Sequence, residues 1–318
     1  MEPNSSPAAS GERVRGTRPS IRARRRRKSD AGVAFVFLLP NILGFVLFSV
    51  VPIVATFALS LFDWPLIRPP SFAGLGNYIT LFTKDPVFGQ VVLNTLYYVA
   101  VYVALNLVVS LTFATWLAKN ARGYALFRAA LFISTMVPPV AIALIWQWIY
   151  NPVFGLLNAV LAAIGIQGPN WTGDTNWGMI SLILMSVWEL FGYNMFIFIA
   201  GIQGIPEQLY EAAHLDGAGR WQKFWYITLP MLSPIIFFGT TLTLITSFQT
   251  FDQVFVLTNG GPGNATTILG LYIYNNAFRF FRMGYGATVS VVMFAMILAV
   301  TLLQFALQRK WVYYETER

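Results

Sequence analysis

Six polar or ionisable residues within two long apolar segments are the first candidates for chemistry. A carboxylate in lipid costs on the order of several kcal/mol unless it is paired or wetted, so Glu189 has either a function or a structural hydrogen bond. Neutral hydrogen-bonding groups beside aromatic rings suit a solute with many hydroxyls, such as a sugar. We expect a solute path here, with Asp252 alternatively near the outer interface. The six residues are Glu189, Tyr193, Asn194, Gln249, Asp252 and Gln253.

The composition excludes most other chemistries. The chain has no cysteine and a single histidine, His214, which rules out disulfides, thiolate catalysis and Cys- or His-rich metal sites. The glycine-rich stretch 260–263 predicts a turn and not a phosphate cradle, because no Walker lysine follows it. The sequence also lacks the cluster of His, Asp and Ser that a membrane enzyme would need. We therefore expect no catalytic residue, no metal ligand and no cofactor in this chain.

The elements that carry these residues are predicted to cross a membrane. The 318 residues are 56% hydrophobic and only 11% charged, whereas soluble domains carry about a quarter of their residues as charges. A helix of about 20 apolar residues spans the hydrocarbon layer. Pro138 and Pro139 should kink or break the third such segment, and Asn94 and Asn106 suit hydrogen bonds between helices. We predict an all-α polytopic membrane protein with about six transmembrane helices, near 33–62, 91–118, 127–150, 177–203, 231–258 and 284–307.

Basic residues set the expected orientation. Nine of the 21 Lys and Arg residues lie in a Ser-, Pro- and Gly-rich tail, residues 1–30, which we expect to be disordered. Six spans with both termini in the cytoplasm place 17 basic residues inside and four outside, as the positive-inside rule requires. The tail reads as a membrane anchor and not as a nucleic-acid module. We expect a first helix with its outer connector over 31–90 and a core over 91–318.

The connector 204–230 is more structured than a simple link requires. Pro206 and Glu207 suit the first turn of a helix, where a missing N–H costs nothing and a carboxylate meets the positive helix end. Gly217, after Asp216, predicts a turn because glycine accepts left-handed dihedrals. A second helix is predicted to follow and to stop before Pro230. The connector should therefore be a helix–turn–helix outside the bilayer.

This connector resembles the EAA loop of binding-protein-dependent ABC importer permeases. The resemblance rests on Glu211-Ala212-Ala213, Asp216-Gly217-Ala218, Phe224, Ile227 and Leu229-Pro230. It implies a MetI-like fold in which the loop forms a coupling helix docked on a separate ATPase, with Glu211, Ala212, Ala213, Asp216, Gly217 and Ala218 as coupling residues. It also implies a second permease subunit, a dimer of ATPase subunits that hold ATP and Mg, and an extracytoplasmic solute-binding lipoprotein.

The resemblance extends over roughly residues 33–313 and points to the carbohydrate branch, the maltose and glycerol-3-phosphate permease type. The stretches 74–78, 155–158 and 201–206 are similar to that branch, and 251–252 with 257–262 is typical of the first permease of a heterodimeric pair. Residues 133–136 depart from it. The resemblance implies a bacterial or archaeal cell membrane and a sugar-like solute. The alternative is an ion-coupled secondary transporter, which should show intramembrane ionisable pairs and inverted repeats.

Overall fold

The computed structural model describes residues 34–119 and 122–313. The predicted basic tail, residues 1–30, lies outside the described residues. The chain divides into two compact units, Met1–Ala55 and Thr56–Arg318. The described residues of the first unit, 34–55, belong to one apolar helix that begins at Ala34, passes through a π-helical stretch, η1 (Val46–Val50), and continues as α2 (Val51–Leu59), whose last four residues belong to the second unit. Its side chains are mostly exposed along its length.

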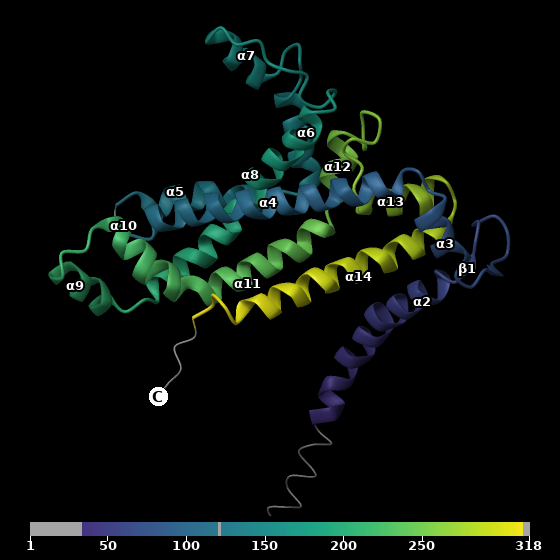
Figure 1. The fold of residues 1–318 in the computed structure, drawn as a ribbon, viewed down its shortest axis with the longest axis horizontal. Coiled ribbons are helices and arrows are strands. Elements are labelled where there is room, and N and C mark those ends of the chain that lie inside the picture. The colour runs from purple at the N-terminus through teal and green to yellow at the C-terminus, as the bar shows by residue number, and fades with distance from the viewer. Residues whose placement is uncertain (1–33, 120–121, 314–318) are drawn as a thin grey trace, which may run out of the picture. The chain divides into compact units, whose positions relative to one another are not determined.

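Long helices form the core of the second unit (Figure 1). Helices α4 and α8 have the most extensive contact, α11 packs on both of them, and α14 packs on α11. The large side chains of Tyr98, Met185 and Phe248 are fully buried where α4, α8 and the end of α11 meet. The helices of this core are α4 (Phe88–Leu117), α8 (Trp177–Gln203), α11 (Leu229–Phe248) and α14 (Met283–Gln308).

A polar triad joins three of these helices inside the apolar core. The Asn194 amide of α8 donates to Asn106 Oδ1 of α4 at 2.6 Å and to Thr243 Oγ1 of α11 at 2.7 Å. In a membrane such bonds hold helices together because no water competes for the polar groups. The predicted interhelical hydrogen bond of Asn106 is therefore confirmed. That of Asn94 is wrong, since its amide bonds to loop carbonyls of Asn264 and Thr267 at 2.8 and 3.1 Å.

The third predicted span is broken, as its two prolines indicate. Helix α5 (Tyr124–Phe132) runs through a short 3-10 turn, η2 (Ile133–Met136), and α6 (Pro139–Ile149) then departs at 102°. Pro138 has an extended ψ of 136°, which ends the first piece and lets Pro139 begin the second. Among the described residues, five helices are long and apolar enough to cross a membrane, or six if this bent pair is one span.

The fifth span differs from the prediction at both ends. It begins at Arg220 and continues through α10 (Arg220–Lys223) and η3 (Phe224–Thr228) into α11, so the predicted stop before Pro230 is wrong. The reason is a π-helical turn: the Leu229 N–H bonds to the Phe224 carbonyl, five residues back, directly before the proline that has no N–H. The helix ends at Phe248 instead of near residue 258, and α12 (Asp252–Leu257) is a separate short helix.

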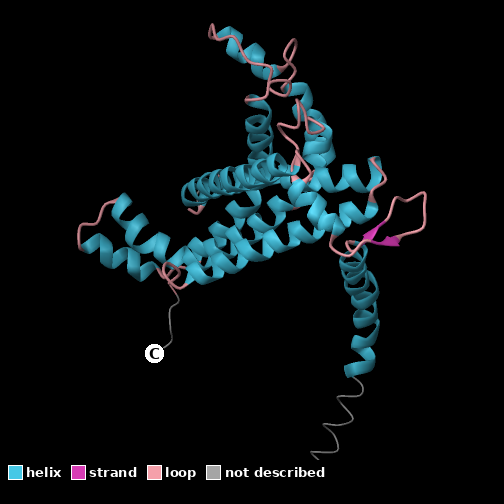
Figure 2. Cartoon of the chain, turned by 45° about the vertical axis from the view of Figure 1, so that its right-hand side comes forward, coloured by secondary structure: helices cyan, strands magenta, loops and turns pink. Residues whose placement is uncertain are grey.

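Several small elements connect the long helices. Glycine is required at Gly284, because an added Cβ would lie 1.9 Å from the Phe62 carbonyl oxygen of the two-stranded ribbon. Figure 2 shows that ribbon as the only strand pair within the described residues. The small elements are β1 (Phe62–Asp63) paired antiparallel with β2 (Ser71–Phe72), α3 (Gly76–Thr83), α7 (Leu156–Ala163), α9 (Glu207–Leu215), α13 (Leu269–Tyr274) and the π-helical η4 (Asn275–Arg279).

One carboxylate joins three elements at the end where α3 and α13 lie. Asp85 accepts the backbone N–H groups of Val87 and Phe88 at 2.9 and 3.1 Å, just before α4. Its other oxygen accepts hydroxyl groups from Tyr272 of α13 and Tyr285 of α14. Burial works to raise the pKa of Asp85, but these hydrogen bonds outweigh it and hold the pKa below its ordinary value. The charged carboxylate therefore ties α4 to α13 and α14.

Candidate functional site

The connector 204–230 contains the predicted helix and turn. Helix α9 starts directly after Pro206, with Glu207 in its first turn. It ends in a Schellman cap: the Ala218 N–H bonds to the Ala213 carbonyl at 2.9 Å, and the Gly217 N–H to that of His214 at 3.1 Å. Gly217 has a φ of +79°, the left-handed value for which glycine was predicted. The turn between the two helices of the connector is thus confirmed in detail.

The six predicted coupling residues lie on or directly after α9. Glu211, Ala212, Asp216 and Gly217 are exposed, whereas Ala213 and Ala218 are half-buried at the cap. Five large apolar side chains close to them in the sequence are also exposed, namely Leu209, Leu215, Trp221, Trp225 and Tyr226. This exposed group was not predicted from the sequence. Leu209 and Leu215 lie on α9, outside the candidate spans, where exposed apolar side chains suit a surface that a partner covers, whereas the three aromatic side chains belong to the helix 220–248, which can also face lipid.

Three of the six predicted path residues are buried within the second unit. Glu189 is 2% exposed and accepts a hydrogen bond from the Gln253 amide at 2.7 Å, which joins α8 to α12. Asn194 is 4% exposed and belongs to the triad described above. The carboxylate therefore has a structural partner, one of the two explanations left open by the sequence. These three side chains can position their neighbours but do not reach a solute in this arrangement.

The other three predicted path residues are accessible. Tyr193 is 47% exposed on α8. Gln249 and Asp252 are exposed, but they do not lie in the fifth span as predicted: Gln249 follows the end of α11 and Asp252 begins α12. The hydroxyls of Thr246 and Ser247 donate to the Leu242 and Leu244 carbonyls of the same helix at 2.9 and 2.7 Å, just before the helix ends. Gln249 therefore lies in a short non-helical segment, residues 249–251, between α11 and α12.

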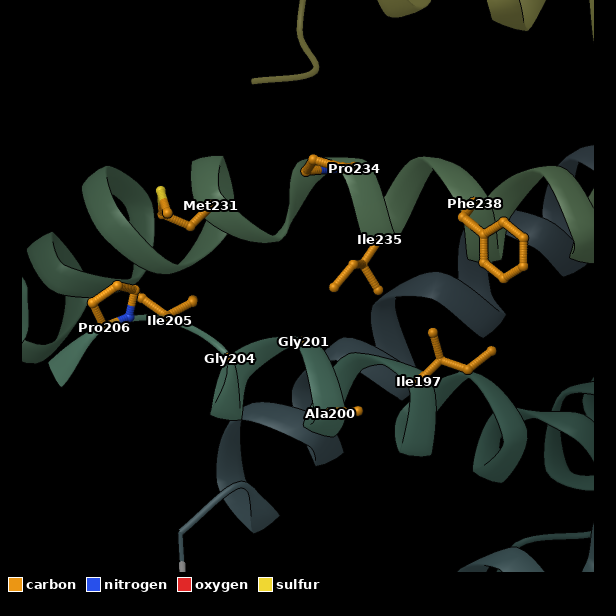
Figure 3. A pocket seen from close by; sticks show the side chains of 10 residues that line it. All are labelled: Ile197, Ala200, Gly201, Gly204, Ile205, Pro206, Met231, Pro234, Ile235 and Phe238. Atoms are coloured by element: carbon orange, nitrogen blue, oxygen red, sulfur yellow. The ribbon is translucent and has the colours of Figure 1, made fainter. Parts of the chain in front are cut away.

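An apolar groove lies between the end of α8 and the start of α11 (Figure 3). It has a volume of about 690 Å³. Beside it the two helices are in close contact, because a Cβ added at Gly201 would lie 2.5 Å from side-chain atoms of Leu232 and Ile235. Sequence reasoning did not find this groove. Its lining residues include Ile197, Ala200, Gly204, Pro206, Pro234 and Phe238.

Metal ligation has no support in residues 34–119 and 122–313. No group of three or more His, Cys, Asp or Glu side chains in that part of the chain is placed to hold a metal ion. This part of the chain instead holds a helix–turn–helix loop at one end of the helix 220–248, a non-helical polar segment at its other end, and apolar helices long enough to cross a membrane. These features suit a membrane transport protein.

The chain belongs to a known transport family. The family described as "Binding-protein-dependent transport system inner membrane component" matches residues 106–313, well over half of the chain. The protein is therefore a multi-pass component of the prokaryotic cytoplasmic membrane and a non-catalytic permease subunit of an ABC importer. This confirms the resemblance seen in the EAA-like loop, and the secondary-transporter alternative is set aside.

Individual relatives and a solved structure agree with this assignment. The lactose transport system permease protein LacF of Rhizobium radiobacter is 36% identical over 282 residues, 87% of this chain and 94% of LacF. The arabinooligosaccharides transport system permease protein AraP of Bacillus subtilis is 33% identical over 282 residues, 88% of this chain and 89% of AraP. A bacterial ABC transporter involved in the import of alginate has a chain with TM-score 0.77 and 22% identity, covering 93% of this chain and all of that one, which shows the shared fold.

Proposed function

We propose that this permease translocates a sugar or sugar-like solute, such as an oligosaccharide or a glycerol-phosphate-type compound. LacF and AraP, each at least 33% identical over most of their length, are named for lactose and arabinooligosaccharides. The accessible groups of Tyr193 and Gln249 offer an aromatic face and a neutral amide, which suit hydroxyl-rich solutes. In this proposal the buried Glu189, Asn194 and Gln253 position the helices that carry these groups, and Asp252, exposed at the start of α12, is a further path residue.

The exposed apolar side chains on and near α9 are the observation that supports an ATPase subunit as a partner. They support docking of an ATPase subunit at Glu211, Ala212, Ala213, Asp216, Gly217 and Ala218, where the buried area contributes most. The exposed charges of Glu211 and Asp216 would add little each as rim ion pairs. ATP and Mg belong to those ATPase subunits. The complete importer contains two ATPase subunits, a second permease with which this chain forms a heterodimer, and a binding lipoprotein that delivers the solute.

Transport in this complex depends on a coupling free energy. ATP shifts the permease between inward- and outward-facing forms only if the ATPase dimer binds the two forms with different affinity. We expect this difference in affinity to arise at the loop, where the ATPase docks. The permease core then opens to one side of the membrane or to the other. In this proposal the chain consists of a first helix with its connector, residues 31–90, and a permease core, residues 91–318, which includes the loop 204–230.

Reconstituted uptake tests the proposed function. The tagged chain is purified from its own host with the subunits that accompany it, and the complex is placed in liposomes that contain ATP and Mg. A panel of radiolabelled mono-, di- and oligosaccharides, with amino acids as controls, is then offered with the co-purified binding protein. We expect ATP-dependent accumulation of a sugar and none of an amino acid. Accumulation of an amino acid alone would rule out the sugar assignment.

The proposed orientation predicts a labelling pattern. The chain has no cysteine, so single cysteines can be placed at will. Lys84→Cys, exposed after α3, should react with a membrane-impermeant maleimide in intact cells, whereas His214→Cys, exposed in α9, should react only after permeabilisation. The measurement is the labelled fraction by gel shift. Labelling of His214→Cys from outside would contradict the orientation.

The path assignment predicts a selective loss of uptake. Tyr193→Ala and Gln249→Ala should each lower the initial uptake rate roughly three- to tenfold, the factor expected for the loss of one solute contact. Recovery of the ATPase subunit should stay unchanged. Thr115→Ala is the control, because the Thr115 hydroxyl bonds to the Thr112 carbonyl of its own helix at 2.9 Å. Normal uptake in the Tyr193 and Gln249 single and double variants would remove this face from the path.

A further inference from the structure

One side-chain hydrogen bond connects α9 to the helix that enters the core. The hydroxyl groups of Tyr210 in α9 and Thr228 in η3 are 2.9 Å apart. The Thr228 hydroxyl also lies 3.3 Å from the Lys223 carbonyl, to which it donates. Because a threonine hydroxyl has a single hydrogen, Tyr210 is the donor to Thr228. Among the described residues, this is the one side-chain hydrogen bond made by α9.

One partner of this hydrogen bond, Thr228, is buried, although most of the loop around it is exposed. Thr228 is 7% exposed, although Trp225 and Tyr226, three and two residues earlier, are both more than half exposed. Thr228 ends the π-helical turn η3 and is followed directly by α11, with Pro230 in the first turn of α11. The hydrogen bond therefore closes residues 210–228 into a ring that is continuous with α11.

On the other side, α9 is separated from α8. The chain leaves α8 at Gln203 and passes through Gly204 and Ile205 to Pro206, which precedes α9. Within residues 34–119 and 122–313, no side-chain hydrogen bond joins α9 to α8. The apolar groove lies at this point, between the last turns of α8 and the first turns of α11 (Figure 3). The residues that line the groove are apolar, so the last turns of α8 and the first turns of α11 can shift against each other without breaking a polar contact there, while the Asn194–Thr243 bond holds the two helices farther along.

We propose that the Tyr210–Thr228 hydrogen bond is a positioning link that makes α9 and the base of α11 move as one unit. A displacement of α9 by its partner is then passed to α11 and alters the groove against α8, instead of being absorbed by the loop. This rests on the proposed function, in which α9 is the element that docks on the ATPase. Neither residue is assigned to the docking surface; both act by tying that surface to a transmembrane helix.

Spin labels across the groove test the link without any knowledge of the solute. Ala200→Cys in α8 and Phe238→Cys in α11 are both exposed and line the groove. The labels are introduced into the purified complex, with cysteines of the other subunits replaced, and their distance distribution is measured by pulsed EPR with and without Mg-ATP and vanadate. In the otherwise unchanged permease we expect a shift of the distance distribution with nucleotide.

Variants that remove one hydroxyl with little change in shape should weaken this response. In Thr228→Val and Tyr210→Phe, the equilibrium constant for the nucleotide-driven shift should fall roughly three- to tenfold, as the loss of one hydrogen bond implies. Thr228→Ser restores the hydroxyl and should restore the response. The double variant should be no worse than either single variant, since both remove the same bond. Thr241→Val is the control, because its hydroxyl bonds within α11, to the Phe237 carbonyl at 2.8 Å.

The possible outcomes separate the link from the function on which it rests. A full nucleotide response in Thr228→Val and Tyr210→Phe, or a Thr228→Ser variant as impaired as Thr228→Val, overturns the link. So does the absence of any nucleotide-dependent shift in the unchanged permease. In all these cases a cross-link from His214→Cys to the ATPase subunit would leave the proposed function intact. Absence of that cross-link in the unchanged complex would instead contradict the docking role of α9.

Discussion

Ala213→Trp is expected to abolish ATP-driven uptake while the chain still inserts into the membrane. Ala213 is half-buried at the cap of α9, and its carbonyl accepts the Ala218 N–H at 2.9 Å. An indole there adds bulk to the surface that we propose meets the ATPase, and a steric conflict at the centre of an interface costs more than one at its rim. We expect recovery of the ATPase subunit to fall at least about 30-fold, which corresponds to about 2 kcal/mol of binding free energy.

A second variant should disrupt the same surface by changing the backbone of the turn after α9. Gly217→Pro cannot adopt the φ of +79° found here, because the pyrrolidine ring holds φ near −65°. It also removes the N–H that bonds to the His214 carbonyl. Ala163→Trp, at an exposed position of α7, is the matched control and should retain the ATPase. Normal ATPase recovery with both Ala213→Trp and Gly217→Pro would show that the loop does not dock.

The secondary structure of the loop was predictable because proline and glycine determine it through their own backbone geometry. Pro206 directly precedes the helix, where its missing N–H costs nothing, and Gly217 follows its end, where φ is positive. Both effects depend on residue type alone and need no knowledge of distant neighbours. The break at Pro138 and Pro139 was predictable for the same reason, although its angle of 102° was not. Local dihedral preference thus located the helix and the turn of the loop that we propose docks on the ATPase.

The fifth span shows where this kind of reasoning fails. Pro230 was expected to stop a helix, but the π-helical turn before it shifts the hydrogen bonds so that the helix continues. The apolar run was expected to continue to residue 258, but the helix ends at Phe248. Hydropathy records only that a residue prefers lipid or a protein interior. It does not report whether two adjoining apolar pieces form one helix or two.

The candidate path residues show the second limit, which is helix rotation. Tyr193 and Asn194 are adjacent in α8, yet one is 47% exposed and the other 4% exposed. Adjacent residues are about 100° apart around a helix, so they necessarily face different surroundings. In a soluble helix an apolar stripe would indicate the buried face, but here both the lipid side and the packed side are apolar. Contacts such as Asn194 with Asn106 and Thr243 are therefore visible only in three dimensions.

Close helix packing predicts a large effect at a single glycine. At Gly192 in α8, an added Cβ would lie 2.3 Å from the Leu131 carbonyl oxygen and 3.2 Å from the Phe132 Cα, both backbone atoms of α5. Backbone cannot rotate away as a side chain can, so Gly192→Ala must separate α5 from α8. The hydroxyl of Ser134, which bonds to the Glu189 carbonyl at 3.1 Å, would move with them.

We expect Gly192→Ala to lower the free energy of unfolding by about 3 kcal/mol, the upper end of the range for overpacking. The control is the same substitution at Gly89 in the first turn of α4, where nothing lies within 4 Å of the added Cβ. Gly89→Ala should leave stability unchanged or raise it by up to about 1 kcal/mol, because alanine favours the helix. The measurement is the unfolding midpoint in mixed micelles of rising SDS content. Equal midpoints for the two alanine variants would mean that α5 and α8 do not meet at Gly192.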